Sequence, residues 1–209
     1  MVVSEHRDRP AHGPWDEADV DISDGVERVD LGGLLVAAHP GIDVQVQVDQ
    51  STGAVVQLTL ARADAAVQLQ PYAAPRSGGL WDDVRRQLCS SISQGGGLVE
   101  EADGAFGIEL RAQVPASDGA AGLQPARFVG IDGPRWFLRA VFLGAAARPG
   151  DAASDFDALV RTLAVVRGNE AMPVGSPIPL RLPEAPAQAP AAPQTISLPV
   201  RGPEITETR

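Results

Sequence analysis

Polar and apolar residues alternate over three segments in the first third of the chain. Residues 43–49, 56–60 and 67–70 place Val or Leu at every second position, with Gln, Thr or Asp between them. A period of two is typical of strands that bury one face, and the Ser51-Thr52-Gly53 segment supplies a turn between the first two. The pattern predicts three antiparallel strands with one apolar face and a Gln-rich opposite face.

The period then changes to that of a helix. Residues 79–94 carry apolar side chains three or four positions apart, and glycines at 95–97 end the pattern. The apolar positions are Trp81, Val84, Leu88 and Ile92. Residues 152–164 repeat this spacing, so the chain is predicted to contain two main helices.

Four more strands are predicted between the two helices. They cover residues 98–100, 106–114, 127–131 and 135–143. The last two form a hairpin around Asp132-Gly133-Pro134, in which Gly133 accepts a positive φ. Both faces of this hairpin carry large apolar side chains, which predicts a central pair of strands that is covered on both sides.

The order of elements is three or four strands, a helix, four strands and a helix. This order predicts an α+β domain in which two main helices pack on a mostly antiparallel sheet. In outline it resembles the Mog1/PsbP-like sandwiches, in which a sheet carries helices and function lies in surface loops.

Charge and composition divide the chain further. The net charge is −10, and residues 15–30 alone contribute seven acids against one Arg. Too few apolar residues accompany these acids for the segment to fold alone. We therefore predict a disordered acidic arm over residues 1–25, which is either a linear motif for a basic partner or a solubilising leader. A single domain over 26–172, an extended surface segment over 173–183 and a disordered Pro/Ala-rich tail over 184–209 follow.

Several classes of protein are not expected from this sequence. The acidic total argues against a coat on nucleic acid or on an anionic membrane. The first residues carry charges where a signal peptide needs apolar residues, and no long apolar run predicts membrane insertion. The single cysteine, Cys89, fits a reducing compartment, so a cytoplasmic location is expected. Cys89 lies on the first predicted helix, where a buried thiol is expected rather than a nucleophile.

Catalytic motifs are scarce. His39 is the only histidine in the predicted domain, and no HxxxH, CxxC, P-loop or GxSxG spacing is present. We therefore expect no metal, no cofactor and no catalytic residues. A small hydrolase that pairs His39 with Asp132 or Asp82 is the weakest alternative.

The candidate binding residues are those of an Arg- and Trp-containing cluster around the predicted hairpin. They are Arg76, Asp132, Arg135, Trp136, Arg139 and Arg167. Alternation places Arg135 and Arg139 on the same face as Phe137, a mixture of guanidinium and aromatic groups that suits an anionic or protein partner. The structural alternative is that Asp132 pairs with Arg135 across a tight turn while Arg139 stacks on a neighbour. Whether the four arginines meet in one pocket distinguishes these interpretations.

Several short segments together resemble an actinobacterial family of Ala/Gly/Val-rich proteins of unknown function. The segments are Tyr72–Ser77, Leu80–Arg85, Asp132–Arg139, Val165–Gly168 and Met172-Pro173, and the resemblance covers about residues 13–183. Members of that family are often encoded near dUTPase and a small OB-fold protein. The resemblance implies no reaction, cofactor or catalytic residue, because the family has none assigned.

Two functions are therefore predicted. The first is a cytoplasmic accessory or protein-interaction domain without catalytic activity, with an unknown protein partner. It would use the Arg/Trp hairpin end or the Gln-rich sheet face. The alternative is a nucleotide- or nucleic-acid-linked binding protein that uses the Arg/Trp cluster.

Overall fold

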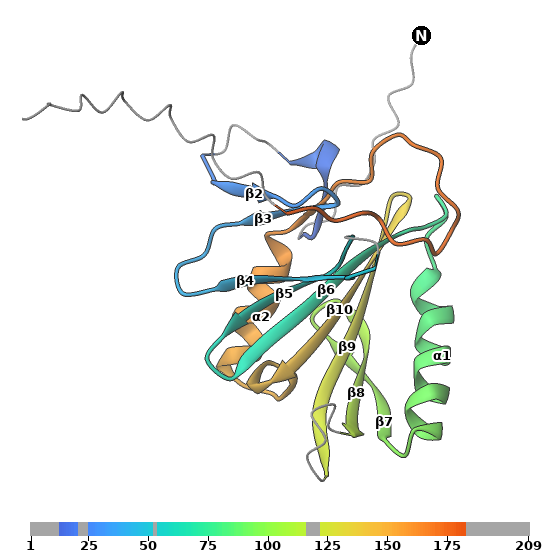
Figure 1. The fold of residues 1–209 in the computed structure, drawn as a ribbon. Helices are drawn as coiled ribbons and strands as arrows, with labels where there is room; N and C mark the ends of the chain where they lie inside the picture. Colours follow the sequence, from blue (N-terminus) through green and yellow to red (C-terminus); the bar gives the residue numbers. More distant parts are fainter. Residues whose placement is uncertain (1–12, 21–24, 52–53, 116–121, 183–209) are drawn as a thin grey trace, which may run out of the picture.

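A large antiparallel sheet forms the centre of the computed structural model, which describes residues 13–20, 25–51, 54–115 and 122–182 (Figure 1). Its strand order is β4-β5-β6-β10-β9-β8-β7. The strands are β4 (Asp43–Val48), β5 (Val55–Arg62), β6 (Ala65–Ala73), β7 (Leu98–Gly104), β8 (Gly107–Pro115), β9 (Leu123–Gly133) and β10 (Trp136–Gly144). All seven overlap the strands predicted from alternation, and the α+β class with a mostly antiparallel sheet is confirmed.

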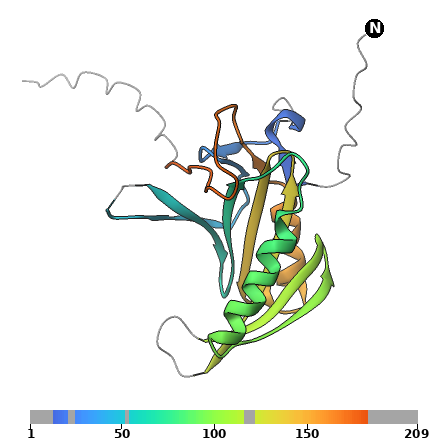
Figure 2. The same cartoon turned by 90° about the vertical axis from the view of Figure 1, so that its right-hand side faces the viewer.

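The two helices pack on opposite faces of this sheet (Figures 1 and 2). Helix α1 (Leu80–Gln94) contacts β7, β8 and β9, and α2 (Asp151–Arg161) lies on the other face. The prediction for α2 extended to residue 164, but the helix ends earlier because Ala164 and Val165 are buried in strand pairing.

The β9–β10 hairpin is a central pair that is buried on both faces, as its sequence predicted. Trp136, Leu138 and Phe142 belong to the main core, together with Phe156 and Leu163 from the α2 region. Their neighbour Phe137 points the opposite way, into a second core under α1. This second core also contains Ala74, Trp81 and Leu110. The two faces of the β9–β10 hairpin therefore pack into two different hydrophobic cores.

The Gln-rich face of the first three strands is only partly covered. Leu58, Leu60 and Leu69 are completely buried, whereas the intervening Gln68 and Gln70 are half-buried. Strand β4 departs from the prediction of one buried apolar face, because Val44 and Val48 are exposed. Its position at the edge of the sheet explains the difference.

A small second sheet was not predicted from alternation. It has the order β1-β11-β3-β2. Its strands are β1 (Trp15–Asp16), β2 (Arg28–Asp30), β3 (Leu34–Ala37) and β11 (Ala164–Val165). Strands of two to four residues are too short to show a period of two, so their pairing depends on tertiary contacts. Short 3-10 helices, η1 (Glu17–Asp19) and η2 (Ala145–Ala147), follow β1 and β10.

Part of the predicted disordered arm is folded, which corrects that prediction for residues 13–20. Strand β1 runs parallel to β11, and the backbone N–H of Trp15 donates to the Leu163 carbonyl at 2.8 Å. Gly13 and Pro14 are buried. The sequence argument considered only whether the apolar residues of this segment could fold alone. It did not include strand β11, with which the segment pairs. Residues 1–12 and 21–24 of the predicted arm lie outside the described residues.

The segment after β11 lies along the domain. Ile178 and Leu180 are buried in the main core, and Leu180 forms isolated bridges with Gly32 and Val55. Backbone hydrogen bonds tie the predicted extended surface segment to β6 and to the loop between β2 and β3 as far as Arg181, whereas Leu182 is exposed. The predicted tail over 184–209 lies outside the described residues. None of the helices formed by the described residues is long and apolar enough to cross a membrane.

Candidate functional site

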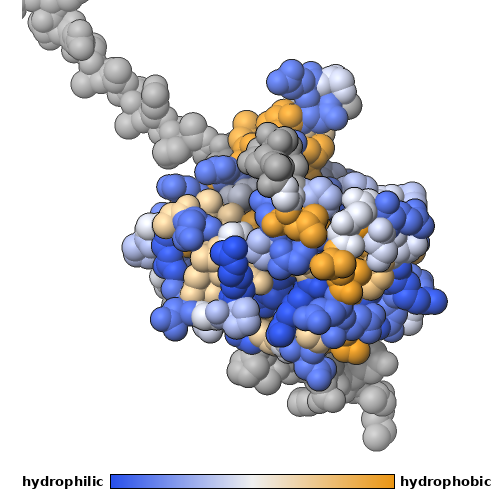
Figure 3. Space-filling view, turned by 90° about the horizontal axis from the view of Figure 1, so that it is seen from below, coloured by the Kyte–Doolittle hydropathy of each residue, from blue (hydrophilic) through white to orange (hydrophobic). Residues whose placement is uncertain are grey.

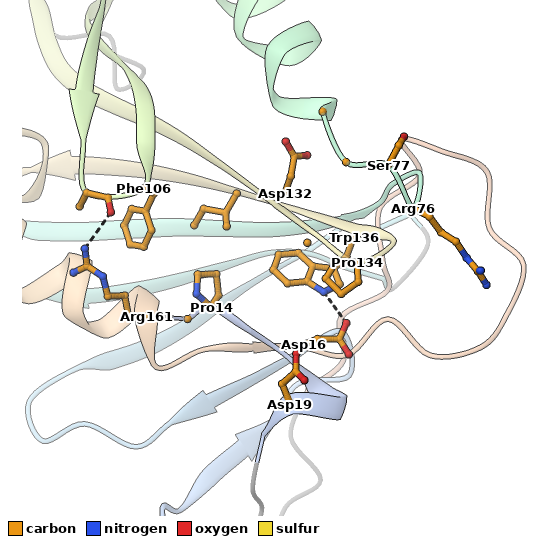
Figure 4. A pocket seen from close by; sticks show the side chains of 16 residues that line it. Pro14, Asp16, Asp19, Arg76, Ser77, Phe106, Asp132, Pro134, Trp136 and Arg161 are labelled. Carbon is orange, nitrogen blue, oxygen red and sulfur yellow. Dashed lines mark hydrogen bonds between the residues drawn. The ribbon is translucent and has the colours of Figure 1, made fainter. Parts of the chain in front are cut away.

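A cleft of about 750 Å³ lies at the end of the large sheet, beside the β9–β10 turn (Figure 4). Five segments of the chain form its walls: the N-terminal segment around β1, the loop before α1, the β7–β8 turn, the β9–β10 turn and the end of α2. The surface at the opposite end of the molecule is mainly hydrophilic, and its hydrophobic residues form separate groups (Figure 3). We refer to the cleft beside the β9–β10 turn as the hairpin-end cleft.

The β9–β10 turn that borders the cleft has a different geometry from the predicted one. Gly133 pairs with Trp136, so Pro134 and Arg135 are the two turn residues, and the positive φ of 66° falls on Arg135. A proline followed by a left-handed residue is the pattern of a type II turn. Gly133 is required for another reason: a Cβ there would overlap the indole of Trp136.

Two of the predicted arginines hold this turn in place. The Arg135 guanidinium donates to the Gly168 carbonyl at 3.0 Å, and Arg167 Nε donates to the Arg135 carbonyl at 3.2 Å. Arg167 is buried and also donates to the Glu170 carbonyl. These bonds fix the unfavourable backbone conformation of Arg135. Both guanidinium groups are therefore engaged by main-chain oxygens.

Asp132 occupies the N-terminal end of α1. Its carboxylate accepts hydrogen bonds from the backbone N–H groups of Leu80, at 3.1 Å, and Trp81, at 3.5 Å. The residue before the helix, Gly79, has no side chain with which to cap it. Asp132 thus acts as a capping residue supplied by a strand, and its negative charge is favourable at the positive end of the helix dipole.

Replacing Asp132 by Ala is expected to lower the free energy of unfolding by about 1 kcal/mol, the usual cost of a lost helix cap. Asp132→Asn should keep most of that stability, because an amide oxygen still accepts the bonds. Urea denaturation followed by circular dichroism measures both changes. Asp103→Ala is the matched control, since Asp103 is an exposed strand carboxylate. An Asn variant as unstable as the Ala variant would contradict the capping role.

Trp136 joins the N-terminal segment to the cleft. Its side chain is only 2% exposed, and its indole Nε1 donates to Asp16 Oδ2 at 2.9 Å (Figure 4). Asp16 in turn accepts a bond from the Ala18 backbone N–H, which starts η1. The N-terminal wall of the cleft is therefore attached to the hairpin by a charge-assisted hydrogen bond.

The remaining predicted residues lie on two different surfaces. Arg76 is exposed at the rim of the hairpin-end cleft, and within the described residues its guanidinium has no hydrogen-bond or ion-pair partner. Arg139 instead lies in a separate groove between α1 and strands β6 and β10. There it donates to Gln70 Oε1 at 2.8 Å and stands 5.6 Å from the ring of Tyr72. The four predicted arginines do not meet in one pocket.

Tyr72 and Cys89 are the two groups of the α1 face with shifted pKa values. Burial raises the pKa of Tyr72, and the positive charge of Arg139 opposes that rise. Burial and the negative charge of Glu101 raise the pKa of Cys89, which Arg85 partly offsets. A thiol whose pKa is raised is a weaker nucleophile at neutral pH, so Cys89 has no chemical activation here.

Sequence reasoning missed the residues that complete the cleft. Pro14, Asp16 and Asp19 come from the supposed arm, whereas Phe106 and Arg161 come from a turn and a helix end. Arg161 lies 4.9 Å from the Phe106 ring and donates to the Ala105 carbonyl at 3.2 Å. The sequence signal that could have found the N-terminal wall is Trp15, an isolated aromatic residue in the acidic segment, which pairs with Ala164 in the small sheet.

For the described residues, the candidate chemistry that the sequence offered is a metal site or a pairing of His39 with Asp132. No group of three or more His, Cys, Asp or Glu side chains among them is arranged to hold a metal ion. His39 lines a different cavity, beside Arg62 and Asp155, and its Nε2 lies 3.3 Å from Thr162 Oγ1. The residue is therefore not placed in the cavity that contains Asp132.

Comparison with known proteins gives one family. Residues 13–189 match the model of a family described as a protein of unknown function (DUF3710). The match begins at Gly13, the first residue of the cleft wall formed by the N-terminal segment. A search of curated proteins found no match.

Proposed function

The chain belongs to the DUF3710 family of proteins of unknown function, and we propose that it is an accessory domain that binds another protein without catalysing a reaction. A short segment of the partner occupies the hairpin-end cleft. The observation that carries this proposal is the composition of the cleft, whose apolar walls are bordered by several carboxylates.

The walls supply the area for an apolar anchor. They include Pro14, Phe106, Ile131, Pro134 and Trp136, which come from three separated parts of the chain. A concave, mainly apolar surface with a few oriented polar groups is the usual form of a ligand site. Proline and aromatic rings are also rigid, so ordering them on binding costs little entropy.

The charges around the cleft indicate the chemistry of the partner. Three carboxylates line it, from Asp16, Asp19 and Asp132, against two guanidinium groups from Arg76 and Arg161. Arg161 already donates to a carbonyl, and Asp16 and Asp132 already accept bonds from Trp136 and from the α1 backbone, so the net charge of −1 decides the preference rather than an unpaired group. The cleft therefore favours a segment that carries an apolar or aromatic residue next to a basic one.

A nucleotide ligand has less support from the same geometry. Phosphate binds well at a helix N-terminus, but the first N–H groups of α1 are already bonded to the Asp132 carboxylate. Arg135 and Arg167 donate to main-chain carbonyls, and Arg139 lies in another groove. Of the four predicted arginines, Arg76 is the one that lines the cleft and whose guanidinium has no bond to another described residue.

We also propose a cytoplasmic location, which the single cysteine favours. The family resemblance supports an actinobacterial origin and a gene near that of dUTPase. The products of neighbouring genes are therefore the first partners to test.

The test is selection of peptides from a displayed random library on the full chain. We expect selected peptides to combine an apolar or aromatic anchor with Arg or Lys. Pro134→Arg should weaken their binding at least tenfold, because it adds bulk and positive charge at the cleft. Arg76→Glu should strengthen it, because it removes a like charge from the rim. Binding is measured by fluorescence anisotropy of a labelled selected peptide.

Matched controls lie at the opposite end of the sheet. Arg148 and Pro149 are exposed and border other cavities, so Arg148→Glu and Pro149→Arg reproduce the same changes of charge and size. These two variants should leave peptide binding unchanged. Selected peptides that are acidic, or that bind Pro134→Arg as tightly as the original chain, would overturn the proposal. Weaker binding to Arg76→Glu would support the anionic alternative instead.

A further inference from the structure

Strand β4 forms an open edge of the large sheet. It pairs with β5 on one side, and no strand among the described residues pairs with it on the other. The β4–β5 hairpin also projects away from the rest of the molecule (Figure 2). A row of backbone donors and acceptors is thus accessible to another strand.

The side chains of β4 do not protect this edge. Natural edge strands carry Lys, Pro or inward-pointing charges that prevent pairing with other chains. Residues 43–48 read Asp-Val-Gln-Val-Gln-Val, with no Lys, Arg or Pro. Val44 is 44% exposed and Val48 is 40% exposed, and they lie on the same face as the half-buried Val46. An apolar stripe therefore runs along the open edge.

The regular part of β4 has a defined centre. Pairing with β5 is continuous from Asp43, opposite Ala61, to Gln47, opposite Gln57. The register then shifts between Gln47 and Val48. Gln45 is the middle residue of the uninterrupted stretch, and it is the natural position for a two-fold axis.

We infer that β4 binds β4 of a second copy of this chain, antiparallel, about a two-fold axis at Gln45. In this register Val44 lies opposite the partner's Val46, and Asp43 lies opposite the partner's Gln47. The apolar residues of both strands then share one face, and an acid faces an amide. The large sheets of the two copies become continuous through this pair.

Charge and geometry exclude the two neighbouring registers that also match the apolar faces. An axis at Val44 would pair only residues 43–45 of the two β4 strands with each other, because β4 begins at Asp43. An axis at Val46 would place Asp43 opposite the partner's Asp49, and like charges directly opposite each other are destabilising. It would also include the irregular step between Gln47 and Val48. A register shifted by one residue mixes Val with Gln on each face, which loses the apolar contact.

The size of the contact sets the expected affinity. One pair of short strands buries less surface than a standard protein interface, so the dimer should form reversibly and depend on protein concentration. The surface is also separate from the hairpin-end cleft, which lies beside the β9–β10 turn. Loss of self-association therefore leaves the proposed peptide binding unaffected, and the two proposals fail independently.

Site-specific disulfide formation tests the register. In the full chain with Cys89→Ser, the variant Gln45→Cys places two thiols directly opposite each other across the axis, where Cβ atoms are about 4.5–5.5 Å apart. Mild oxidation should give a covalent dimer. Gln47→Cys is the matched control on the same strand and face, because its two thiols would lie roughly 13 Å apart along the strands. It should remain monomeric under the same oxidation.

Two further measurements make the test decisive. A mixture of Asp43→Cys and Gln47→Cys proteins should give the mixed disulfide dimer, while each variant alone gives little. Sedimentation velocity on the natural chain should show a concentration-dependent dimer that Val44→Lys removes without changing the circular dichroism spectrum. A monomer at all concentrations, or equal cross-linking of Gln45→Cys and Gln47→Cys, would overturn the inference.

Discussion

Replacing Arg127 by Leu is expected to lower the free energy of unfolding by about 3–5 kcal/mol, because buried Asp157 loses its cation and buried Glu109 keeps only the more exposed Arg111. Arg127 Nη1 lies 3.1 Å from Glu109 Oε2, and its Nη2 lies 2.7 Å from Asp157 Oδ1. The Arg127 and Glu109 side chains are 7% and 3% exposed. The guanidinium also stacks 3.8 Å from the ring of Phe142, so the loss includes a cation–π contact.

Urea denaturation of this variant has a natural control on the same side of the sheet. Arg62 pairs with Asp155, but both side chains are largely solvent-exposed, so Arg62→Leu should cost about 0–1 kcal/mol. A triple replacement of Arg127, Glu109 and Asp157 by Leu should recover much of the stability lost in the single variant, because it removes the unpaired charges. Equal losses for Arg127→Leu and Arg62→Leu would show that the buried cluster is not the cause.

The parts of the fold that the sequence predicts are those whose pattern is local. Helix α1 was placed within one residue of its observed start, because its apolar side chains recur at helical spacing and glycines end it. The β9–β10 hairpin was predicted to be central because large apolar residues occupy both faces, and its two cores confirm this. These features depend on periodicity and turn chemistry within a few residues.

The small sheet depends on contacts between distant residues. Trp15 pairs with Ala164, and Leu35 pairs with Ala164 from the other side. No periodic signal connects these positions, because each strand is too short to show one. The apolar residues of the acidic segment were therefore assigned to an unfolded arm, although a partner that covers them exists later in the chain.

The candidate site was predicted only in part, because it too depends on contacts between residues that are far apart in the sequence. The position of Trp136 and Asp132 at the hairpin end followed from the predicted turn. Their roles did not, because Asp132 acts on Leu80 and Trp136 acts on Asp16, both far away in the sequence. The argument from alternation grouped Arg135 with Arg139 on one strand face. Arg135 is a turn residue with a positive φ, however, and its side chain follows the turn instead.

Removing residues 1–20 is expected to destabilise the domain by about 2–4 kcal/mol and to abolish peptide binding in the cleft. The deletion removes β1, exposes the surface that Pro14 covers, and leaves the Trp136 indole N–H without its acceptor. Loss of apolar burial and of a buried hydrogen-bond partner each cost about 1–3 kcal/mol. The cleft also loses one of its walls. Urea midpoints and the anisotropy of a labelled cleft-binding peptide measure the two effects.

A shorter deletion distinguishes a folded wall from an acidic leader. Removing residues 1–12 eliminates one Glu, one Asp and two Arg residues but retains Gly13 and all that follows it. The stability and the peptide binding of this variant should therefore match those of the full chain. Asp16→Ala should reproduce part of the larger loss, because it breaks the bond to Trp136 while leaving β1 in place, and Asp16→Asn should recover some of it. If instead both deletions unfold at the same urea concentration, residues 13–20 contribute nothing to the fold. The cleft would then have to be redefined without its N-terminal wall.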